Sequence, residues 1–589
     1  MRISNYEGTR RPKKVTTIPL ERKAKQTQLL RPICRPCYSD WFAPTFVPRY
    51  ISVKLVSHFT CLFTLSQVNR IEYITAPYIF LSATIYYWYT KPMASTVTAV
   101  KYETVIGLEV HAQLNTKSKM FCSCSADYAN TPPNTHVCPV CLGMPGVLPV
   151  INRRAVEFTM MTALALNCTV SEYSKFDRKN YPYPDLMKGY QISQFDAPIG
   201  VKGKLTIEVD GQKKDIGITR VHLEEDVSKL IHRTSFDGKG YSLMDVNRSG
   251  VPLMEVVGEP DLRSPEEARQ YLMKLHTILQ YIGVSLANME EGSFRCDANI
   301  SIRPEGTDKL LTKVEVKNMN SFRAVFRALE YEAQRQRKAL EEGVRLVQET
   351  RGWVEAEGKT VSQRSKEFAH DYRYFPEPDL PPLSVSRKWV EEVKALLPEL
   401  PEARRDRFVT EFGLSLYDAN LLTGTKAMAD YFEAILKTGK PEDLPLTNRA
   451  KLAGNWLLGE FTRLLNAGNL EISQVKITPG HFCQLFDLIN KGSLNGPAAK
   501  QVFEEMFNTG KSAADVVAQK GLSQISDSGE LEKMAEKVIA DNPQAAADFN
   551  AGKESAMKFL VGQFMKASRG RANPQIATQL LKNKLGANK

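Results

Sequence analysis

The sequence predicts an α+β fold in which an antiparallel β-sheet domain is followed by an all-α domain and a small helical tail. Three observations lead to this prediction. Segments that alternate between polar and apolar residues occur between Val105 and about Val385, separated by well-punctuated helices. The Pro-rich stretch Phe375–Leu383 ends this part of the chain. Beyond it, nearly every segment has a helical pattern.

The length of the chain predicts several domains rather than one compact core. Single hydrophobic cores stop growing at about 250–300 residues, so 589 residues predict roughly two to four domains. Ten cysteines in this length do not make a disulfide scaffold, which favours a reducing compartment. The predicted parts are an unassigned basic extension over 1–97, the sheet domain over 98–395, the helical domain over 396–520 and the tail over 521–589.

The net charge of +12 is concentrated near the amino terminus. Residues 1–92 contain 14 Lys/Arg and four Asp/Glu, which leaves 64 Lys/Arg and 62 Asp/Glu in the rest of the chain. The body is therefore nearly neutral. Any surface that binds a nucleic acid must then be a local basic patch.

Three interpretations of residues 1–92 remain open. Met93 opens a segment typical of a bacterial start, so the preceding residues can reflect a start codon placed too early, which predicts a cytoplasmic bacterial protein. The basic, acid-poor composition also resembles a transit peptide, which predicts a mitochondrion or chloroplast. The third interpretation is a membrane anchor over Tyr73–Tyr89, although Pro77 interrupts this uncharged segment. No membrane contact is expected for the body.

The sheet domain contains one hairpin and two helices with clear local signals. Asp210-Gly211 is a strong turn dipeptide, so Lys204–Asp210 and Asp215–Glu224 are expected to pair as a hairpin. Ser264, Pro265 and Glu267 provide an N-cap, a first-turn proline and a capping-box glutamate, and Gly283 ends this helix. A second helix, over Ser321–Glu342, stops at the next glycine. In the helical domain, the expected helices include Pro401–Phe412, Ala427–Leu436 and Asn448–Leu465.

Polar side chains of a distinctive kind recur on one face of four predicted strands. Side chains alternate across a strand, so residues two apart share a face. The strands lie within Val105–Leu114, Ile218–Asp226, Phe294–Arg303 and Thr312–Asn318. Their polar faces carry Glu109, His111 and Gln113; Arg220, His222, Glu224 and Asp226; Arg295, Asp297, Asn299, Ser301 and Arg303; and Lys313, Glu315 and Lys317.

Two interpretations of these faces compete. Antiparallel sheets often bury one face and solvate the other, so alternation alone indicates no chemistry. A solvated face is usually filled with Lys, Glu and Thr, however, whereas this one is rich in His, Asn, Asp and Arg. Carboxylates beside His at i, i+2 can converge on Mg²⁺, which takes oxygen ligands and retains waters. Neighbouring Arg and Lys can neutralise a transferring phosphoryl group. His111 would either bind the ion or orient a water.

Four cysteines have a spacing typical of a zinc knuckle. Cys122 and Cys124 form one pair, and Cys138 and Cys141 form the other, with a Pro-containing loop between them. Four thiolates complete the tetrahedral coordination of zinc and leave no open position, so the predicted site is structural rather than catalytic. His136 lies between the pairs and can replace one ligand. The alternative is a group of thiols that binds nothing.

Several long strings resemble the B subunits of glutamyl/aspartyl-tRNA amidotransferases. The resemblance runs in the same order from about residue 102 to the carboxyl end without large gaps, and it does not cover residues 1–92. The strings are VIGLEVHAQL, SKFDRKNYPYPDLMKGYQISQFDAPI, ITRVHLEED, GSFRCDANISIRPEG, EVKNMNSF, DYRYFPEPDLPPL and KFLVGQFMKASRGRANP.

The resemblance implies part of a heterotrimeric, ATP-dependent carbon–nitrogen ligase. The enzyme would convert Glu-tRNA(Gln) to Gln-tRNA(Gln) and, in many organisms, Asp-tRNA(Asn) to Asn-tRNA(Asn). An amidase A subunit would release ammonia from glutamine, and a small C subunit would brace the pair. The B subunit would bind the misacylated tRNA and phosphorylate its side-chain carboxylate with ATP, so that ammonia can displace the phosphate. The implied fold is a cradle around a β-sheet, a helical domain and a tRNA-binding tail.

The resemblance also implies site residues. The Mg²⁺ ligands would be Glu109, His111 and Glu224, and the four-cysteine zinc knuckle occurs in many members of the family. In the basic tail, Lys566, Arg569 and Arg571 become candidate phosphate contacts, with a solvated helix end as the alternative. The residues expected to line the ATP and substrate pocket are Lys179, Tyr181, Glu225, Arg295, Asp297, Asn299, Glu315 and Lys317. For Lys179 and Tyr181 the alternative is a positioned loop that does not contact the substrate.

Two rival functions follow from the same residues. A non-catalytic tRNA-binding scaffold would keep the zinc and the basic tail but transfer no phosphoryl group. A related archaeal subunit that serves only Glu-tRNA(Gln) carries a large inserted domain, for which Phe375–Leu383 leaves no room. The sequence contains no P-loop, so ATP would be held by the sheet face. It also contains no amidase string with paired serines, so the chain is not expected to hydrolyse glutamine alone.

Overall fold

The computed structural model describes residues 101–365, 372–439, 444–521, 528–568 and 572–586. The chain divides into two units, Met1–Val97 and Thr98–Lys589. Every described residue belongs to the second unit. The predictions made for residues 1–92 therefore lie outside the described residues. The described part contains no helix that is both long and apolar enough to cross a membrane.

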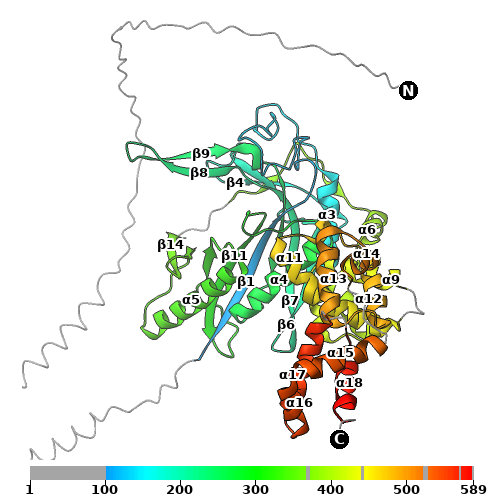
Figure 1. Ribbon diagram of the computed structural model, residues 1–589. Helices are drawn as coiled ribbons and strands as arrows, with labels where there is room; N and C mark the ends of the chain where they lie inside the picture. The colour runs from blue at the N-terminus through cyan, green and yellow to red at the C-terminus, as the bar shows by residue number, and fades with distance from the viewer. Residues whose placement is uncertain (1–100, 366–371, 440–443, 522–527, 569–571, 587–589) are drawn as a thin grey trace, which may run out of the picture. The chain divides into compact units, whose positions relative to one another are not determined.

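A sheet of 12 strands forms the centre of the first part of the described chain (Figure 1). The strand β1 (Tyr102–Gln113) lies in the middle, between β10 (Pro252–Gly258) and β11 (Phe294–Pro304). From β10 the sheet continues through β7 to β5, β4 and β15, and from β11 through β12 to β13 and β14. The other strands of the sheet are β2 (Thr169–Val170), β4 (Asp177–Asn180), β5 (Tyr190–Ser193), β6 (Gly200–Val209), β7 (Gln212–Glu225), β12 (Val314–Lys317), β13 (Glu349–Val354), β14 (Lys359–Ser365) and β15 (Phe375–Pro376).

The expectation of a purely antiparallel sheet is wrong at one pair of strands. β12 and β13 run parallel, whereas the other pairs in the described sheet are antiparallel. A parallel pair needs a long crossover, and the helix α5 (Phe322–Glu341) lies between these two strands in the chain and provides it. The sheet is therefore mixed, within an α+β arrangement that agrees with the prediction.

The predicted hairpin is formed by β6 and β7. Their pairing ends at Val209 and Gln212, so that Asp210 and Gly211 make a two-residue turn. Both turn residues have positive φ, 51° and 76°. This conformation suits Asp-Gly and matches the twist of the strands, which explains why the dipeptide predicted the turn correctly.

Helices cover the apolar face of the sheet (Figure 1). α3 (Arg153–Ala165), α4 (Pro265–Tyr281) and α5 pack against strands including β6, β7 and β11. Leu108, Val110 and Ala112 of β1 are fully buried beneath them, as the alternation predicts. The opposite, polar face of the same strands is left for the site described below.

The helix ends agree with their sequence signals, with one difference. Ser264 accepts the backbone N–H of Glu267 at 3.1 Å, as an N-cap should, and Gly283 has the positive φ of a helix stop. The Glu267 carboxylate accepts the backbone N–H of Arg263, one residue earlier than a capping box requires. The reciprocal half of the predicted capping box is therefore wrong. α5 begins after its N-cap Ser321, and Gly343 follows it with positive φ.

The Pro-rich segment returns to the sheet before the domain ends. β15 pairs antiparallel with β4, and β16 (Leu383–Ser384) pairs with β3 (Tyr173–Ser174). The following helix, α6 (Arg387–Lys394), contacts α3. Proline is tolerated here because these strands are only two residues long and lie at an edge. β8 (Lys229–Thr234) and β9 (Gly240–Asp245) form a separate exposed hairpin, and the short helix η1 (Val246–Arg248) follows it.

Beyond α6 the described chain is helical, as predicted. A second core is built around the fully buried rings of Phe408, Phe432, Phe461, Phe482 and Phe503. The helices around it are α7 (Pro401–Phe412), α8 (Leu416–Leu422), α9 (Lys426–Thr438), α10 (Leu446–Trp456), the π-helical turn Leu457–Phe461, α11 (Thr462–Gly468), the turn Ile472–Gln474, α12 (Pro479–Asn490), α13 (Gly496–Thr509) and α14 (Ala513–Lys520).

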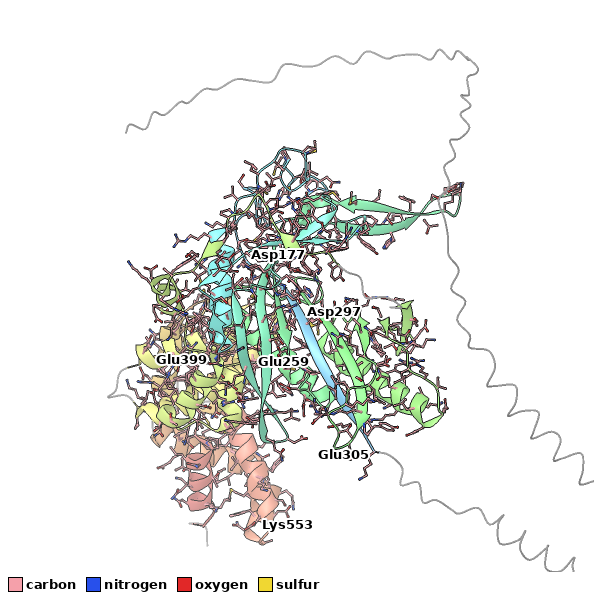
Figure 2. The ribbon with its side chains drawn as sticks, turned by 180° about the vertical axis from the view of Figure 1, so that it is seen from behind. Asp177, Glu259, Asp297, Glu305, Glu399 and Lys553 are labelled. Carbon is pink, nitrogen blue, oxygen red and sulfur yellow. The ribbon has the colours of Figure 1, made fainter. Side chains whose placement is uncertain are left out.

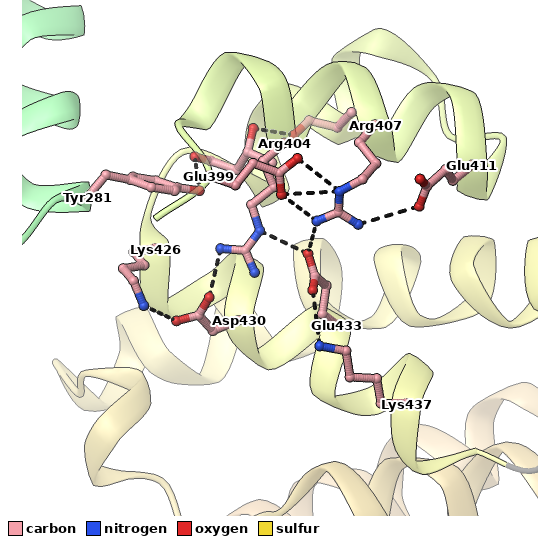
Figure 3. Close-up of polar contacts among 11 residues, drawn as sticks. Tyr281, Glu399, Arg404, Arg407, Glu411, Lys426, Asp430, Glu433 and Lys437 are labelled. Carbon is pink, nitrogen blue, oxygen red and sulfur yellow. Dashed lines mark hydrogen bonds and ion pairs between the residues drawn. The ribbon is translucent and has the colours of Figure 1, made fainter. Parts of the chain in front are cut away.

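A network of ion pairs joins α7 to α9 (Figure 3). The buried Arg404 of α7 reaches Asp430 at 2.7 Å and Glu433 at 3.0 Å. Arg407, one turn further along, contacts the same Glu433 and lies 2.6 Å from Glu399. The network therefore crosses between two helices rather than running along one.

The carboxyl-terminal helices have a third core. Leu560, Phe564 and Leu581 are fully buried within it. The helices are α15 (Ser528–Asp541), α16 (Pro543–Asn550), α17 (Glu554–Ala567) and α18 (Pro574–Gly586). Three separate apolar clusters thus correspond to the predicted sheet, helical and tail regions, whose boundaries stay predictions.

Candidate active site

A cavity of about 490 Å³ opens on the polar face of the sheet. Asp297, one of the residues that line the cavity, lies nearer to Asp177 than Glu305 does (Figure 2). Glu305 lies at the opposite end of the sheet. The cavity brings together most of the residues that the sequence singled out. The predicted site residues that line it are Glu109, His111, Lys179, Tyr181, Glu224, Arg295, Asp297, Glu315 and Lys317.

The closest convergence of ligand atoms involves His111, Glu224 and Glu255. Glu255 of β10 lies directly opposite His111 of β1 and, across its other edge, opposite His222 of β7. His111 Nε2 is 3.3 Å from a Glu255 oxygen and 3.7 Å from a Glu224 oxygen. One ligand atom from each of the three side chains lies within 4.8 Å of the others. Strand pairing, rather than sequence proximity, therefore builds this cluster.

The cluster has the properties of a cation site. Within the described residues, Glu224 Oε2 is buried and accepts no hydrogen bond. A buried carboxylate oxygen without a partner is costly, and a bound cation would satisfy it. The two carboxylates provide the hard oxygen atoms that Mg²⁺ prefers, and waters and phosphates would complete the coordination. The imidazole of His111 offers a ring nitrogen as the third ligand atom. The residues present thus fit the ion that the sequence implied.

The electrostatics of the cluster follow from its burial. Burial raises the pKa of Glu224, and Lys179 opposes this shift. Burial would lower the pKa of His111, but Glu255 and Glu224 outweigh it and raise the pKa to about 9. For His222 burial dominates and lowers the pKa to about 4. At neutral pH and in the absence of a cation, His111 is therefore protonated and positively charged, whereas His222 is neutral.

Glu109 lines the same cavity but belongs to a neighbouring group of polar residues. Its carboxylate accepts a hydrogen bond from Asn299 at 2.9 Å, and its Cα pairs with Asp297 across β11. Burial, together with the charges of Glu255 and Asp297, raises the pKa of Glu109. The three-residue cluster does not include Glu109, so its role as a ligand stays a prediction. Asn299 lines an adjacent cavity of about 290 Å³ together with Glu109.

Two basic side chains of the cavity wall, Arg295 and Lys317, are each held in place by acidic residues. Arg295 reaches Asp226 at 3.0 Å, and Asp226 also accepts a hydrogen bond from Gln113 at 2.7 Å. Lys317 contacts Asp297 and lies 3.3 Å from Glu315. These pairs fix the cations in positions along the cavity wall. Such an arrangement suits a ligand that carries several negative charges.

The expectations for Glu225 and for the basic residues of the tail have different outcomes. Glu225 is buried, and Lys188 contacts it at 2.5 Å; it lines a small cavity beside the cysteines and not the main one. The expectation that it lines the main pocket is therefore wrong, because successive residues of a strand point to opposite faces. Lys566 is exposed near the end of α17, whereas Arg569 and Arg571 lie outside the described residues.

Glu255 is the residue that the sequence reasoning missed. It lies in β10, where its neighbours Pro252, Leu253, Met254, Val256 and Val257 are all apolar. A single carboxylate in an otherwise apolar strand is costly to bury without a partner, and this was the available signal. The strand has no alternation of polar residues, so the pattern used for the other strands did not find it.

The four cysteines converge as predicted. One sulfur from each of Cys122, Cys124, Cys138 and Cys141 lies within 4.8 Å of the others, and the sulfurs of Cys138 and Cys141 are 3.9 Å apart. A tetrahedral zinc with Zn–S bonds of about 2.3 Å places its sulfurs about 3.8 Å apart. The donor set therefore fits zinc. The hydrogen bond from Cys122 lowers the pKa of Cys141. The buried Lys119, which donates to the carbonyl oxygen of His136, lies nearby and adds to this shift.

Comparisons with known proteins agree with these observations. Residues 104–391 match the family described as the GatB/GatE catalytic domain, and residues 430–585 match the GatB domain. A protein from Dehalococcoides mccartyi strain 195, named as the B subunit of an aspartyl/glutamyl-tRNA(Asn/Gln) amidotransferase, is 60% identical over 487 residues, 82% of this chain and 99% of its own length. Proteins of the same name from Carboxydothermus hydrogenoformans and Moorella thermoacetica are both 56% identical, over 82% of this chain and 99% and 100% of their lengths.

Proposed function

This chain belongs to the family of aspartyl/glutamyl-tRNA(Asn/Gln) amidotransferase B subunits, and on this premise we propose that it activates the carboxylate of a misacylated tRNA with ATP. Its partners would be an amidase A subunit, which supplies ammonia, and a small C subunit. The products would be Gln-tRNA(Gln) and Asn-tRNA(Asn). A cytoplasmic or organellar location follows from this function, because aminoacyl-tRNA is used where proteins are made.

The proposal depends above all on the convergence of His111, Glu224 and Glu255 inside a cavity with basic walls. A carboxylate is a poor electrophile because it is negatively charged and has no good leaving group. Transfer of the γ-phosphoryl group of ATP to a side-chain carboxylate oxygen gives ADP and an acyl phosphate. Ammonia then attacks the carbonyl carbon, the bond to the phosphate oxygen breaks, and inorganic phosphate leaves with the formation of an amide.

The residues of the cavity have separate roles in this scheme. His111, Glu224 and Glu255 would hold Mg²⁺, with Glu109 nearby as a further candidate. A bound Mg²⁺ neutralises phosphate oxygens during phosphoryl transfer. Arg295 and Lys317 are positioned by Asp226 and by Asp297 with Glu315, so they present positive charge to the transferring group without reorganising. Lys179 adds a further cation on the same cavity.

We assign the four cysteines a structural zinc. Four sulfur ligands leave no position for substrate or water, so the ion would hold the loop around Cys122 to Cys141 rather than take part in chemistry. This loop borders Lys188 and Glu225, which contact the strands of the cavity.

The direct test uses the chain assembled with its A and C subunits. Supplied with Glu-tRNA(Gln), glutamine and ATP, the complex should form ADP and Gln-tRNA(Gln). Glu224→Ala and Glu109→Ala should lose both products while retaining tRNA binding. Glu305→Ala, an exposed glutamate just beyond the end of β11, is the matched control and should behave as wild type.

The rival function makes the opposite prediction. A non-catalytic scaffold would give wild-type activity in Glu224→Ala, because the phosphorylating group would then reside in another subunit. That outcome would remove the proposed phosphorylation centre from this chain while leaving its membership of the family intact.

A further inference from the structure

One wall of the cavity consists of four aromatic rings that the proposed chemistry does not use. We call Tyr181, Phe195, Tyr372 and Tyr374 the aromatic wall; all four line the cavity. The rings follow one another in contact. Tyr181 and Tyr372 have centroids 5.7 Å apart, Tyr372 and Tyr374 are 6.0 Å apart, and Tyr374 and Phe195 are 4.1 Å apart and nearly parallel, at 7°.

Backbone hydrogen bonds and strand pairing tie the aromatic wall to three segments of the chain. The N–H of Asn180, next to Tyr181, donates to the carbonyl oxygen of Tyr372 at 2.9 Å. The N–H of Phe195 donates to the buried Asp177 carboxylate at 3.2 Å. Tyr374 immediately precedes β15, which pairs with β4. The four rings therefore lie within one to three residues of strands of the sheet, next to β4, β5 and β15.

Two rings of the aromatic wall remain open to solvent. Phe195 is 49% exposed and Tyr372 is 37% exposed. Tyr374 stacks on one face of the Phe195 ring, so the exposed part of Phe195 consists of its other face and its edge. Leaving a phenyl ring in water forgoes the free energy of burial, and a ring that only filled a core would be covered on both faces. Its open face lies beside a cavity lined with charged groups.

The charge beside the aromatic wall selects the type of ligand. The Lys179 ammonium lies 5.1 Å from the centroid of Tyr372 and 5.7 Å from that of Tyr181. The cation already occupies the region in front of these two rings, so a second cation there would be repelled. A flat, uncharged ring system joined to an anionic group would satisfy both features. Nucleotides have this chemistry, because aromatic side chains stack on bases while cations contact phosphates.

We propose that the aromatic wall is a stacking site for a purine base, with the open face of Phe195 as its main contact and Lys179 beside the attached phosphate. This inference rests on the proposed function, which brings two adenosines to the cavity. One belongs to ATP and the other is the 3′-terminal adenosine of the tRNA. The chemistry of the site is shared by both sources, and binding experiments separate them.

The experiment measures binding to the assembled complex, without turnover. One arm compares ADP with CDP in the presence of magnesium, since a purine stacks more strongly than a pyrimidine. The other arm compares uncharged tRNA with the same tRNA shortened by its terminal adenosine. Phe195→Leu removes the aromatic face but keeps an apolar side chain, whereas Phe195→Trp keeps it. Phe236→Leu, at the fully exposed tip of the β8–β9 hairpin, is the matched control.

Each possible result either assigns the aromatic wall to one adenosine or overturns the proposal. In Phe195→Leu, about tenfold weaker ADP binding with a smaller preference for ADP over CDP assigns the wall to ATP. Loss of the advantage of full-length over shortened tRNA assigns it to the terminal adenosine. Phe195→Trp should retain wild-type binding in either case. Unchanged binding in both arms overturns the proposal, and Tyr372→Leu repeats the test if Phe195→Leu does not assemble.

These readouts do not depend on phosphorylation. If the wild-type complex forms no ADP from ATP and Glu-tRNA(Gln), the proposed function fails, yet the binding arms still report whether the aromatic wall holds a purine. If turnover is normal and Phe195→Leu binds both ligands as wild type does, only the present inference fails.

Discussion

At the scale of the residue, the decisive feature is that Glu255 lies between two histidines with different pKa values. Its carboxylate contacts His111 at 3.3 Å and His222 at 3.5 Å. Both contacts lower the pKa of Glu255 despite its burial. A single carboxylate thus controls the charge state of the histidine that would bind the cation. This makes Glu255 a sharper probe of the site than its place in an apolar strand suggests.

We expect Glu255→Gln to raise the magnesium concentration needed for half-maximal activity by about 10–100-fold. The substitution keeps the shape of the side chain but removes the negative charge of one proposed ligand. The measurement is ADP formation by the assembled complex over a magnesium titration. Glu259→Gln is the control, because Glu259 is exposed just after β10 and contacts Thr219 (Figure 2). An unchanged magnesium requirement in Glu255→Gln would exclude it as a ligand.

The pKa of His111 predicts how magnesium binding depends on pH. In the cation-free protein the pKa is about 9, so His111 is protonated at neutral pH and the proton opposes a bound cation. Magnesium affinity should therefore rise by up to about tenfold per unit between pH 7 and pH 9. Calorimetric titration of Mg²⁺ at several pH values checks this. In Glu255→Gln the rise should move to lower pH, because the main carboxylate that raises the pKa is gone.

At the scale of the element, a cluster of cysteines and a network of ion pairs join segments that are not paired as strands of the sheet. The cysteine loop brings four sulfurs together between β1 and α3. The ion-pair network joins α7 to α9 in the helical region. Both depend on side-chain chemistry rather than on backbone pairing, and each predicts the effect of one substitution.

The purified chain should contain about one equivalent of zinc, and Cys138→Ser should abolish it. A hydroxyl is a poor replacement for a thiolate, so the remaining three sulfurs would not retain a structural ion. Zinc is measured by atomic absorption after extensive dialysis. Cys483→Ser, in α12 and away from the cluster, should keep the full equivalent. Zinc retained in Cys138→Ser would point to another ligand, such as His136.

Arg404→Ala should destabilise the helical region by about 3 kcal/mol. The guanidinium is buried, and its removal leaves the carboxylates of Asp430 and Glu433 without one of their cations (Figure 3). Urea unfolding followed by tryptophan fluorescence measures the change. Arg387→Ala is the control, since Arg387 and its partner Glu172 have side chains 62% and 65% exposed, and it should change stability by less than about 1 kcal/mol. Equal effects of both variants would contradict the argument.

At the scale of the whole molecule, three apolar clusters divide the described chain into parts with different tasks. The sheet region carries the cavity, and the carboxyl-terminal helices have a core of their own in a part of the sequence that is rich in basic residues. Eight basic residues and one acid occur over Lys553–Lys589, in a chain that is otherwise almost neutral after residue 92. This asymmetry favours a task in tRNA binding for the tail that is separate from the chemistry of the cavity.

Replacing Lys566, Arg569 and Arg571 together by alanine should weaken tRNA binding without changing glutamine-independent ADP release per bound tRNA. Each lost phosphate contact should reduce the slope of log affinity against log salt by about one. Filter binding at several salt concentrations gives both quantities. A matched triple substitution of Lys338, Lys388 and Lys437, whose side chains are at least 75% exposed, controls for the loss of positive charge. Equal weakening by both triples would indicate a general charge effect instead.

The sequence by itself determined the elements whose signals are local. The Asp210-Gly211 turn, the Ser264 N-cap and the alternating faces of β1, β7 and β11 all depend on residues close to one another in the chain. The cysteine spacing likewise predicted the convergence of four sulfurs. Turn geometry, capping and side-chain alternation act over a few residues, so a sequence expresses them directly.

Only the tertiary structure decided which strands lie side by side and in which direction. The parallel pairing of β12 with β13, the position of Glu255 between two histidines and the assembly of the aromatic wall all join segments distant in the chain. Strand pairing is chosen by the packing of the whole apolar core, which no short pattern encodes. Much of the charged lining of the cavity was therefore predictable from strand alternation, whereas Glu255, Phe195 and the closest contacts required the fold.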